Sequence, residues 1–166
     1  MSAAAPAVVL AAVADPALRA RVLPLAPRPE QRGWAGVAAD TLPDAERRKA
    51  VPVAMLVDDA PVGFFVLDRG GVPGAERHRG AVGLRALFVD AGHQGRGIGA
   101  AALRALPGFA RERFPGAPAI VLTVNETNPV ARRVYLNAGF RDTGDRYHGG
   151  RLGPQQVLLL DLFTGW

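Results

Sequence analysis

Short apolar runs separated by polar turns predict a layered α/β fold. Strands are expected at 7–13, 51–57, 62–68, 81–89, 119–124, 140–147 and 155–162, where Val, Leu and Ala dominate. Helices are expected at 17–23, around Glu30 to Asp40, at 99–113 and at 129–137, with a charged helical turn at 44–49. The order β-α-α-β-β-β-α-β-α-β-β predicts a mixed, strongly twisted sheet of about seven strands flanked by helices, in one domain over 1–166.

Local signals fix several of these boundaries. Asp15-Pro16 should cap the first helix, and Asn128 should cap the helix at 129–137. Residues 58–61 should form the turn of a β-hairpin. Prolines interrupt the region between Pro24 and Pro43, where Trp34 is expected to face the core. The glycine-rich, charged segment 69–80 is expected to be a mobile polar loop.

The composition narrows the class of protein. The 166 residues are 49% hydrophobic and 21% charged, which suits one compact domain, and the apolar start of the chain lacks the basic residues of a signal peptide, so a cytoplasmic protein is expected. There is no Cys, which excludes disulfides, thiolate zinc sites and cysteine nucleophiles. The three histidines are scattered, so no metal site is expected. No apolar run reaches the roughly 18 residues that span a bilayer, so no membrane partner is expected.

The charge balance allows two interpretations. The net charge is +5, and all basic residues except Lys49 are Arg, whose planar guanidinium suits phosphate groups. A coding bias towards Ala, Arg, Gly and Pro would give the same excess without any functional cause. The arginines are spread among acidic residues rather than clustered, so a basic nucleic-acid-binding module is a weak hypothesis and no nucleic-acid partner is expected.

The segment from Gln94 to Ala100 is the strongest candidate for ligand binding. It reads Gln94-Gly95-Arg96-Gly97-Ile98-Gly99-Ala100 and lies between an expected strand and an expected helix. Glycines let a backbone approach a ligand closely, and the first N–H groups of a helix favour anions such as a pyrophosphate. The spacing matches neither a Walker A loop nor a dinucleotide fingerprint. A simple tight turn between strand and helix is the alternative.

A second candidate is the helix expected at 129–137. Asn128, Ala131, Arg132 and Tyr135 share one face of it, which would suit an elongated polar ligand, and Asn125 ends the strand before it. The alternative is that Asn128 caps the helix, Ala131 and Tyr135 pack, and the arginines are solvated.

The two candidates together resemble the GNAT superfamily of acyl-CoA N-acyltransferases. The resemblance rests on Leu87-Phe88-Val89, on Gln94-x-x-Gly97-x-Gly99, and on Asn125-x-x-Asn128-x-x-Ala131-x-x-x-Tyr135-x-x-x-Gly139-Phe140, about 25 residues later. It covers roughly 84–140, and the order of elements fits over the whole chain. It implies a sheet splayed between the fourth and fifth strands and an enzyme that transfers acetyl from acetyl-CoA to a primary amine.

The resemblance also implies roles for individual residues. The backbone N–H groups of 94–100 would bind the coenzyme A pyrophosphate. Leu87, Phe88 and Val89 lie on the bulged strand whose main chain would hold the acetyl carbonyl and the pantetheine arm, with Leu87 serving the oxyanion. Asn128 would hydrogen-bond near the pantetheine, and Tyr135 would protonate the departing thiolate. Arg96 and Arg132 are added as candidates for the coenzyme phosphates, and each of them could equally be solvated.

The reaction needs few side chains. Acetyl transfer requires a neutral amine, donors for the developing oxyanion and a proton for the sulfur. Tyr135 suits the last role because its pKa is near that of a thiol, about 8.5, so the proton transfer is nearly balanced.

The general base is the point of departure from the family pattern. Many members carry a Glu on the fourth strand, where this chain has Gly83, and the same strand offers only Arg85. Asp68, Glu76, His78 or a water chain would have to serve instead, although for each side chain a solvated surface position is the simpler interpretation. His93 is expected beside the phosphates. A non-catalytic acyl-CoA-binding or sensor domain is therefore the alternative function.

The motifs do not distinguish between classes of acceptor. A small-molecule amine and a peptide amine are both compatible with the motifs. Trp34 and Arg151 lie in segments expected to shape the acceptor site. Dimers are frequent in the family, and the apolar tail 157–166 would suit the interface of a homodimer.

Overall fold

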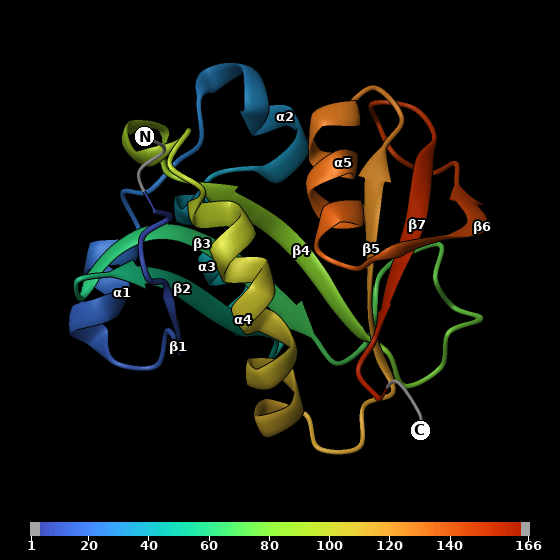
Figure 1. Cartoon of the computed structure of the whole chain (residues 1–166), viewed down its shortest axis with the longest axis horizontal. Helices are drawn as coiled ribbons and strands as arrows, with labels where there is room; N and C mark the ends of the chain where they lie inside the picture. The colour runs from blue at the N-terminus through green and yellow to red at the C-terminus, as the bar shows by residue number, and fades with distance from the viewer. Residues whose placement is uncertain (1–3, 164–166) are drawn as a thin grey trace. The chain divides into compact units, whose positions relative to one another are not determined.

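The computed structural model describes residues 4–163, and in these residues one sheet has the strand order β1-β2-β3-β4-β5-β7-β6 (Figure 1). The strands are Val9–Ala12 (β1), Val51–Val57 (β2), Ala60–Asp68 (β3), Val82–Val89 (β4), Ala119–Asn125 (β5), Arg141–Tyr147 (β6) and Gln155–Asp161 (β7). Strand β5 is parallel to β4 and antiparallel to β7, so the sheet is mixed, as predicted.

The helices are Pro16–Val22 (α1), Arg32–Ala35 (α2), Ala38–Arg47 (α3), Ile98–Arg113 (α4) and Pro129–Asn137 (α5). Short 3-10 helices lie at Pro29–Gln31 and Ala91–His93. Both predicted N-caps are confirmed, because Asp15 accepts the N–H of Leu18 at 2.9 Å and Asn128 accepts that of Ala131 at 3.3 Å. None of the helices described in residues 4–163 is both long and apolar enough to cross a membrane.

The single helix predicted around Glu30 to Asp40 is wrong. Gly36 has φ +75°, a left-handed conformation that ends α2, and α3 starts only at Ala38. Of the helical turn expected at 44–49, residues 44–47 form the last part of α3, which ends at Arg47. Trp34 does not face the core, because 43% of it is exposed on α2.

The segment 69–80 is not simply a solvated loop. Val72 and Ala75 are buried, and Asp145 of β6 accepts a hydrogen bond from Nε of Arg77 and lies 3.1 Å from Nε2 of His78. The prediction of a polar loop therefore missed an apolar side that packs in a core. The last three residues of the apolar tail 157–166, which were expected at a dimer interface, lie outside the described residues.

The chain forms two compact units, each built from two stretches of sequence. The first contains residues 4–66 and 86–106, and the second contains 67–85 and 107–163. Each has its own apolar core. The first core consists of Val13, Val22, Leu25, Ala38, Leu42, Ala45, Ala54, Phe64, Val66 and Phe88. The second consists of Val72, Ala75, Ala81, Ala119, Val121, Val157 and Leu159.

Strand β4 carries the features that prepare it for a ligand. Its parallel pairing with β5 has the register Val82↔Ile120 and Gly83↔Val121 and goes no further, which is the predicted splay. Ala86 has φ +59°, which is uncommon for a residue with a side chain and marks a bulge in the strand. The backbone beyond Ala86 is thus released from regular pairing with β5.

Candidate active site

The loop between β4 and α4 has the geometry of an anion site. Gly95 and Gly97 have φ +80° and +78°, and α4 starts at Ile98. Among residues 4–163, the backbone hydrogen bonds of turns, loops and caps use none of the N–H groups of 94–100. These donors, together with the positive end of the α4 dipole, fit a pyrophosphate. Arg96 is exposed beside them, while Ile98 is buried under the loop.

The loop is tied to the rest of the first unit by the side chain of Gln94. Its Nε2 donates to the backbone oxygen of Val89 at 2.9 Å and to Oε1 of Gln31 at 2.7 Å. The amide thus joins the end of β4 to the 3-10 helix at Pro29–Gln31. The motif predicts only a backbone role for Gln94, and no motif singles out Gln31, so this side-chain contact was not predicted.

The three β4 residues assigned to the acetyl group and pantetheine differ in burial. Phe88 is buried, and its ring lies 5.9 Å from that of Phe64 in the core, so only its main chain is available to a ligand. Leu87 and Val89 are half-buried. The Val89 oxygen has a second lone pair beside the bond from Gln94, so it can accept one more hydrogen bond.

In the second unit, two asparagines build the start of α5. Asn125 is 7% exposed, and its Oδ1 accepts the N–H of Thr127 at 2.9 Å and its hydroxyl at 2.6 Å. The backbone oxygen of Asn125 accepts the N–H of Asn128, whose side chain then caps the helix. The side-chain oxygens of both residues are therefore used locally, and their amide N–H groups are what they can offer a ligand.

Tyr135 lies on α5 with its ring half-buried. The ring packs edge-on against Phe140 with 5.7 Å between the centroids. Loss of hydration in this position raises the pKa of Tyr135 to about 12. The phenol is therefore neutral at physiological pH and can donate a hydrogen bond.

The raised pKa changes the expected proton transfer. A donor of pKa about 12 does not give its proton to a thiolate of pKa about 8.5 in a balanced step, because the thiolate is the much weaker base. Donation of a hydrogen bond to the sulfur does not require the pKa values of donor and thiol to match, and it stabilises the negative charge as it develops. Alternatively, burial of the sulfur in the same surroundings would raise the pKa of the thiol as well.

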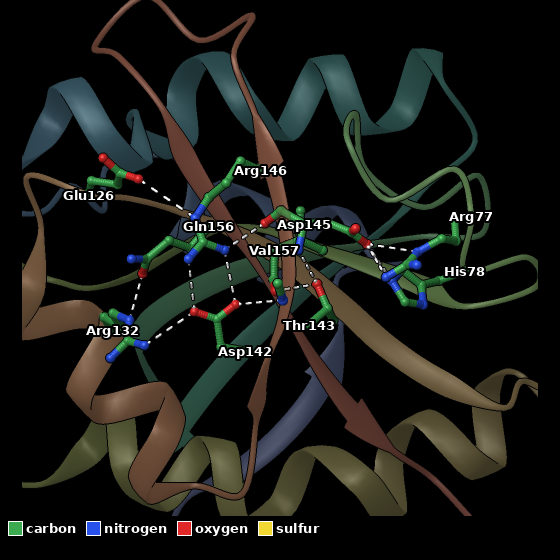
Figure 2. A network of polar contacts seen from close by, with 11 residues as sticks. Arg77, His78, Glu126, Arg132, Asp142, Thr143, Asp145, Arg146, Gln156 and Val157 are labelled. Carbon is green, nitrogen blue, oxygen red and sulfur yellow. Dashed lines mark hydrogen bonds and ion pairs between the residues drawn. The ribbon is translucent and has the colours of Figure 1, made fainter.

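Arg132, a predicted phosphate ligand, is engaged by the protein itself (Figure 2). Its Nε donates to Oε1 of Gln156 on β7 at 2.6 Å, and its Nη2 lies 3.3 Å from Oδ2 of Asp142 on β6. Both partners were missed, because neither belongs to a motif and each lies far from Arg132 in the sequence. Ala131, next to it on α5, is half-buried.

Gly83 has no side chain because there is no room for one. A Cβ there would lie 2.5 Å from the carbonyl carbon of Gly71, closer still to its oxygen, and 2.9 Å from Cγ1 of Val72. The turn that fills this space is held in place, since Arg85 donates to the Gly71 oxygen at 3.1 Å. The absence of a carboxylate at this position of β4 therefore has a steric cause.

The other candidates for a general base have partners among the described residues. Asp68 is nearly buried, lies 3.4 Å from Arg85 and accepts the N–H of Gly70 at 2.8 Å. Glu76 is exposed, and hydrogen bonds from the Gly74 N–H and from its own N–H lower its pKa, which makes it a weaker base. His78 and His93 lie beside Asp145 and Asp90, at 3.1 and 3.3 Å.

The structure divides the predicted site residues between the two units. Leu87, Phe88, Val89 and 94–100 belong to the first unit, and Asn125, Asn128, Ala131, Arg132 and Tyr135 belong to the second. Of the two residues expected at the acceptor, Trp34 is exposed in the first unit and Arg151 in the second. No group of three or more acidic or histidine side chains in residues 4–163 is arranged to hold a metal ion.

Comparison with known proteins identifies the family of the chain. Residues 18–140 match the model of the acetyltransferase (GNAT) family. The chain is 38% identical over 112 residues to the uncharacterized N-acetyltransferase YbbJ of Bacillus subtilis (strain 168). The aligned region covers 65% of this chain and 68% of YbbJ. The chain is also 33% identical over 135 residues to the mycothiol acetyltransferase of Thermobispora bispora. This second aligned region covers 75% of this chain but 41% of that protein.

The fold is shared with a solved enzyme. The aminoglycoside acetyltransferase AAC(6')-Ib, solved with paromomycin and acetyl-CoA, superposes with a TM-score of 0.73 over 93% of each chain, at 20% sequence identity. The matched family model spans both units and includes the loop at 94–100 and helix α5. The chain therefore belongs to the acetyltransferase (GNAT) family and is an acetyl-CoA-dependent N-acetyltransferase.

Proposed function

We propose that the chain transfers the acetyl group of acetyl-CoA to the primary amine of a small molecule. The observation that carries the proposal is the loop at 94–100, where left-handed Gly95 and Gly97 precede α4 and leave a row of N–H donors for the coenzyme pyrophosphate. Support for a small acceptor comes from two similar proteins: one is named a mycothiol acetyltransferase, and the other was solved with an aminoglycoside.

The main chain of β4 would hold the reacting group. Acetyl-CoA supplies a thioester whose carbonyl carbon is open to attack by an amine. The Leu87 N–H, just after the bulge at Ala86, would donate to the carbonyl oxygen as it becomes negative. The Val89 oxygen would accept a hydrogen bond from the pantetheine arm. These roles need no particular side chain, which fits the apolar residues found there.

In the second unit, Tyr135 would donate its phenol proton as a hydrogen bond to the sulfur. The nitrogen–carbon bond forms and the carbon–sulfur bond breaks, so the sulfur leaves with the electron pair and the amine nitrogen loses one proton. Because the raised pKa of Tyr135 keeps it neutral, the donor is present throughout the physiological range. Asn128 would offer its amide N–H to the pantetheine.

The amine must lose its own proton before it attacks. Asp68 is held by Arg85 and Glu76 has a lowered pKa, so we propose that the proton leaves through water rather than to a carboxylate of this chain. The rate should then follow the neutral fraction of the amine, which is larger for an α-amino group of pKa about 8 than for an alkylamine of pKa about 10.4.

The proposal is tested by calorimetric titration with acetyl-CoA, followed by measurement of thiol release in the presence of separate amines. The panel should hold an aminoglycoside, a polyamine, a free amino acid and a peptide with a free N-terminus. Binding with thiol release that depends on a small amine supports the proposal. Release with the peptide alone would overturn the acceptor class. Binding without release from any amine would favour the non-catalytic alternative, and no binding would overturn the assignment of the loop.

A further inference from the structure

Helix α5 carries Asn128 and Tyr135, yet apolar burial does little to fix its position. None of its nine residues is buried, and Val130 is 75% exposed. The apolar contact identified above is the edge-on packing of Tyr135 against Phe140. A short helix with no fully buried residue is marginally stable by itself, so polar contacts must help to set where its side chains point.

Four charged residues form a continuous chain around the start of this helix (Figure 2). Glu126 precedes the helix and lies 3.7 Å from Nε of Arg146 on β6. Arg146 lies 3.0 Å from Oδ1 of Asp142, and Arg132, one turn into the helix, lies 3.3 Å from Oδ2 of the same carboxylate. We call Glu126, Arg146, Asp142 and Arg132 the α5 clamp.

Asp142 is the centre of the α5 clamp. It accepts hydrogen bonds from both arginines and, at 2.9 Å, from the N–H of Gly144. Gly144 has φ +87° and lies at a register shift between β6 and β7. The bulge thus turns the backbone so that Asp142 and Arg146, four residues apart on one strand, meet each other. Arg132 gains a second anchor in Gln156 of β7 at 2.6 Å, which fixes its guanidinium in direction as well as position.

We propose that Arg132 is a positioning residue for acetyl transfer, which acts through the α5 clamp to hold the Tyr135 hydroxyl in place. Arg132 and Tyr135 are three residues apart, so they project from the same face of α5, and a rotation of the helix that breaks the first contact displaces the second. The inference rests on the proposed role of Tyr135. It replaces the expectation that Arg132 binds a coenzyme phosphate, because two of its nitrogens already have protein partners.

The test is a double-mutant cycle on turnover, measured as thiol release, with acetyl-CoA affinity measured by calorimetry in each variant. Arg132→Gln should lower kcat about tenfold and change the Kd for acetyl-CoA less than twofold, because displacement of a catalytic group by about 1 Å is costly. In the Tyr135→Phe background, Arg132→Gln should lower kcat less than twofold further, since its effect passes through the missing hydroxyl. Arg133→Gln is the matched control, because Arg133 is exposed on the same helix and outside the clamp.

Asp142→Asn keeps the size of the side chain and removes its charge, so it should reproduce the effect of Arg132→Gln if the clamp is the cause. A melting curve for each variant identifies any that fail to fold. A tenfold weaker Kd with unchanged kcat in Arg132→Gln would overturn the inference in favour of phosphate binding. If Arg132→Gln still lowers kcat tenfold in the Tyr135→Phe background, the inference is overturned as well. If the unaltered protein releases no thiol with any amine, the proposed function itself has failed.

Discussion

Gly83 shows how a single backbone contact removes a catalytic option. Gly83→Ala places a Cβ against the backbone of Gly71, which Arg85 holds, so the turn must shift or the strand must bend. We expect the free energy of unfolding to fall by about 2 kcal/mol, in the range for overpacked sites. Urea unfolding followed by circular dichroism measures it. Gly83→Glu should be less stable still and should not gain activity.

Gly108 provides the control for this substitution. It lies in α4, is exposed, and a Cβ there would meet nothing within 4 Å. Gly108→Ala should therefore stabilise the chain by up to about 1 kcal/mol, as alanine usually does in a helix interior. A similar loss of stability in both variants would mean that the effect at Gly83 does not come from the contact with Gly71.

Tyr135 should remain protonated well into the alkaline range. With a pKa of about 12, only about a tenth of it is ionised at pH 11, whereas most of an exposed tyrosine of pKa about 10 is ionised there. The chain has two tyrosines, so a Tyr147→Phe variant with ¹³C-labelled tyrosine gives one signal that reports Tyr135 alone.

The sign of the accompanying stability change follows from the same pKa. The folded state holds the Tyr135 proton more tightly than the unfolded state does. The contribution of this proton to the free energy of unfolding is therefore complete below pH 10 and is lost as the pH rises from 10 towards 12. Ionisation of the labelled signal near pH 10 would contradict the burial of this ring and remove the argument that it acts only as a hydrogen-bond donor.

Two glycines, one in the loop at 94–100 and one in the turn between α4 and β5, allow an effect on anion binding to be distinguished from an effect of backbone strain. Gly95 and Gly116 have φ +80° and +86°, and a Cβ at either one would meet nothing within 4 Å. Alanine at either position should destabilise the chain by about 1 kcal/mol, because both need the left-handed conformation. Only Gly95→Ala should weaken acetyl-CoA binding, by about tenfold in calorimetry. Equal affinity in the two variants would place the pyrophosphate elsewhere.

The α5 clamp should no longer stabilise the folded chain at acid pH. Burial by itself raises the pKa of Asp142, but the hydrogen bonds from Gly144, Arg146 and Arg132 and the charge of Arg146 outweigh it, so the pKa is lowered overall. The stabilisation is complete above the ordinary value of about 3.8 and is lost as the pH falls through the lowered pKa. Asp142→Asn should therefore cost stability at pH 7, by about 1 kcal/mol, and almost none at pH 2, measured by urea unfolding.

The elements with local signals were predicted from the sequence, and those set by distant contacts were not. Asn128 and Pro129 mark the start of α5, and the bounds 129–137 are confirmed. The prediction of one helix around Glu30 to Asp40 is wrong at Gly36, because a glycine inside an apolar pattern does not reveal whether its φ is positive. At the site, the motifs point to the loop and to Tyr135, but Asp142 and Gln156 reach Arg132 only through the pairing of β6 with β7.

At the scale of the whole molecule, the chain passes between its two units three times. The crossings fall at 66/67 in β3, at 85/86 in β4 and at 106/107 in α4, so each lies inside a strand or a helix rather than in a linker. Unfolding one unit must therefore break the hydrogen bonding of elements that continue into the other. The two cores are expected to unfold together, in one cooperative transition.

Native-state hydrogen exchange tests this cooperativity. The amides of Phe64 in the first core and Val121 in the second should exchange with the same free energy of opening, equal to that of global unfolding in urea. Acetyl-CoA at 100 times its Kd should raise both values together by about 2.7 kcal/mol, because a ligand that binds only the folded chain stabilises every part that unfolds with its site. If only the Phe64 value rose, the unit that contains the loop at 94–100 would be opening independently of the other unit, and the prediction of one cooperative transition would be wrong.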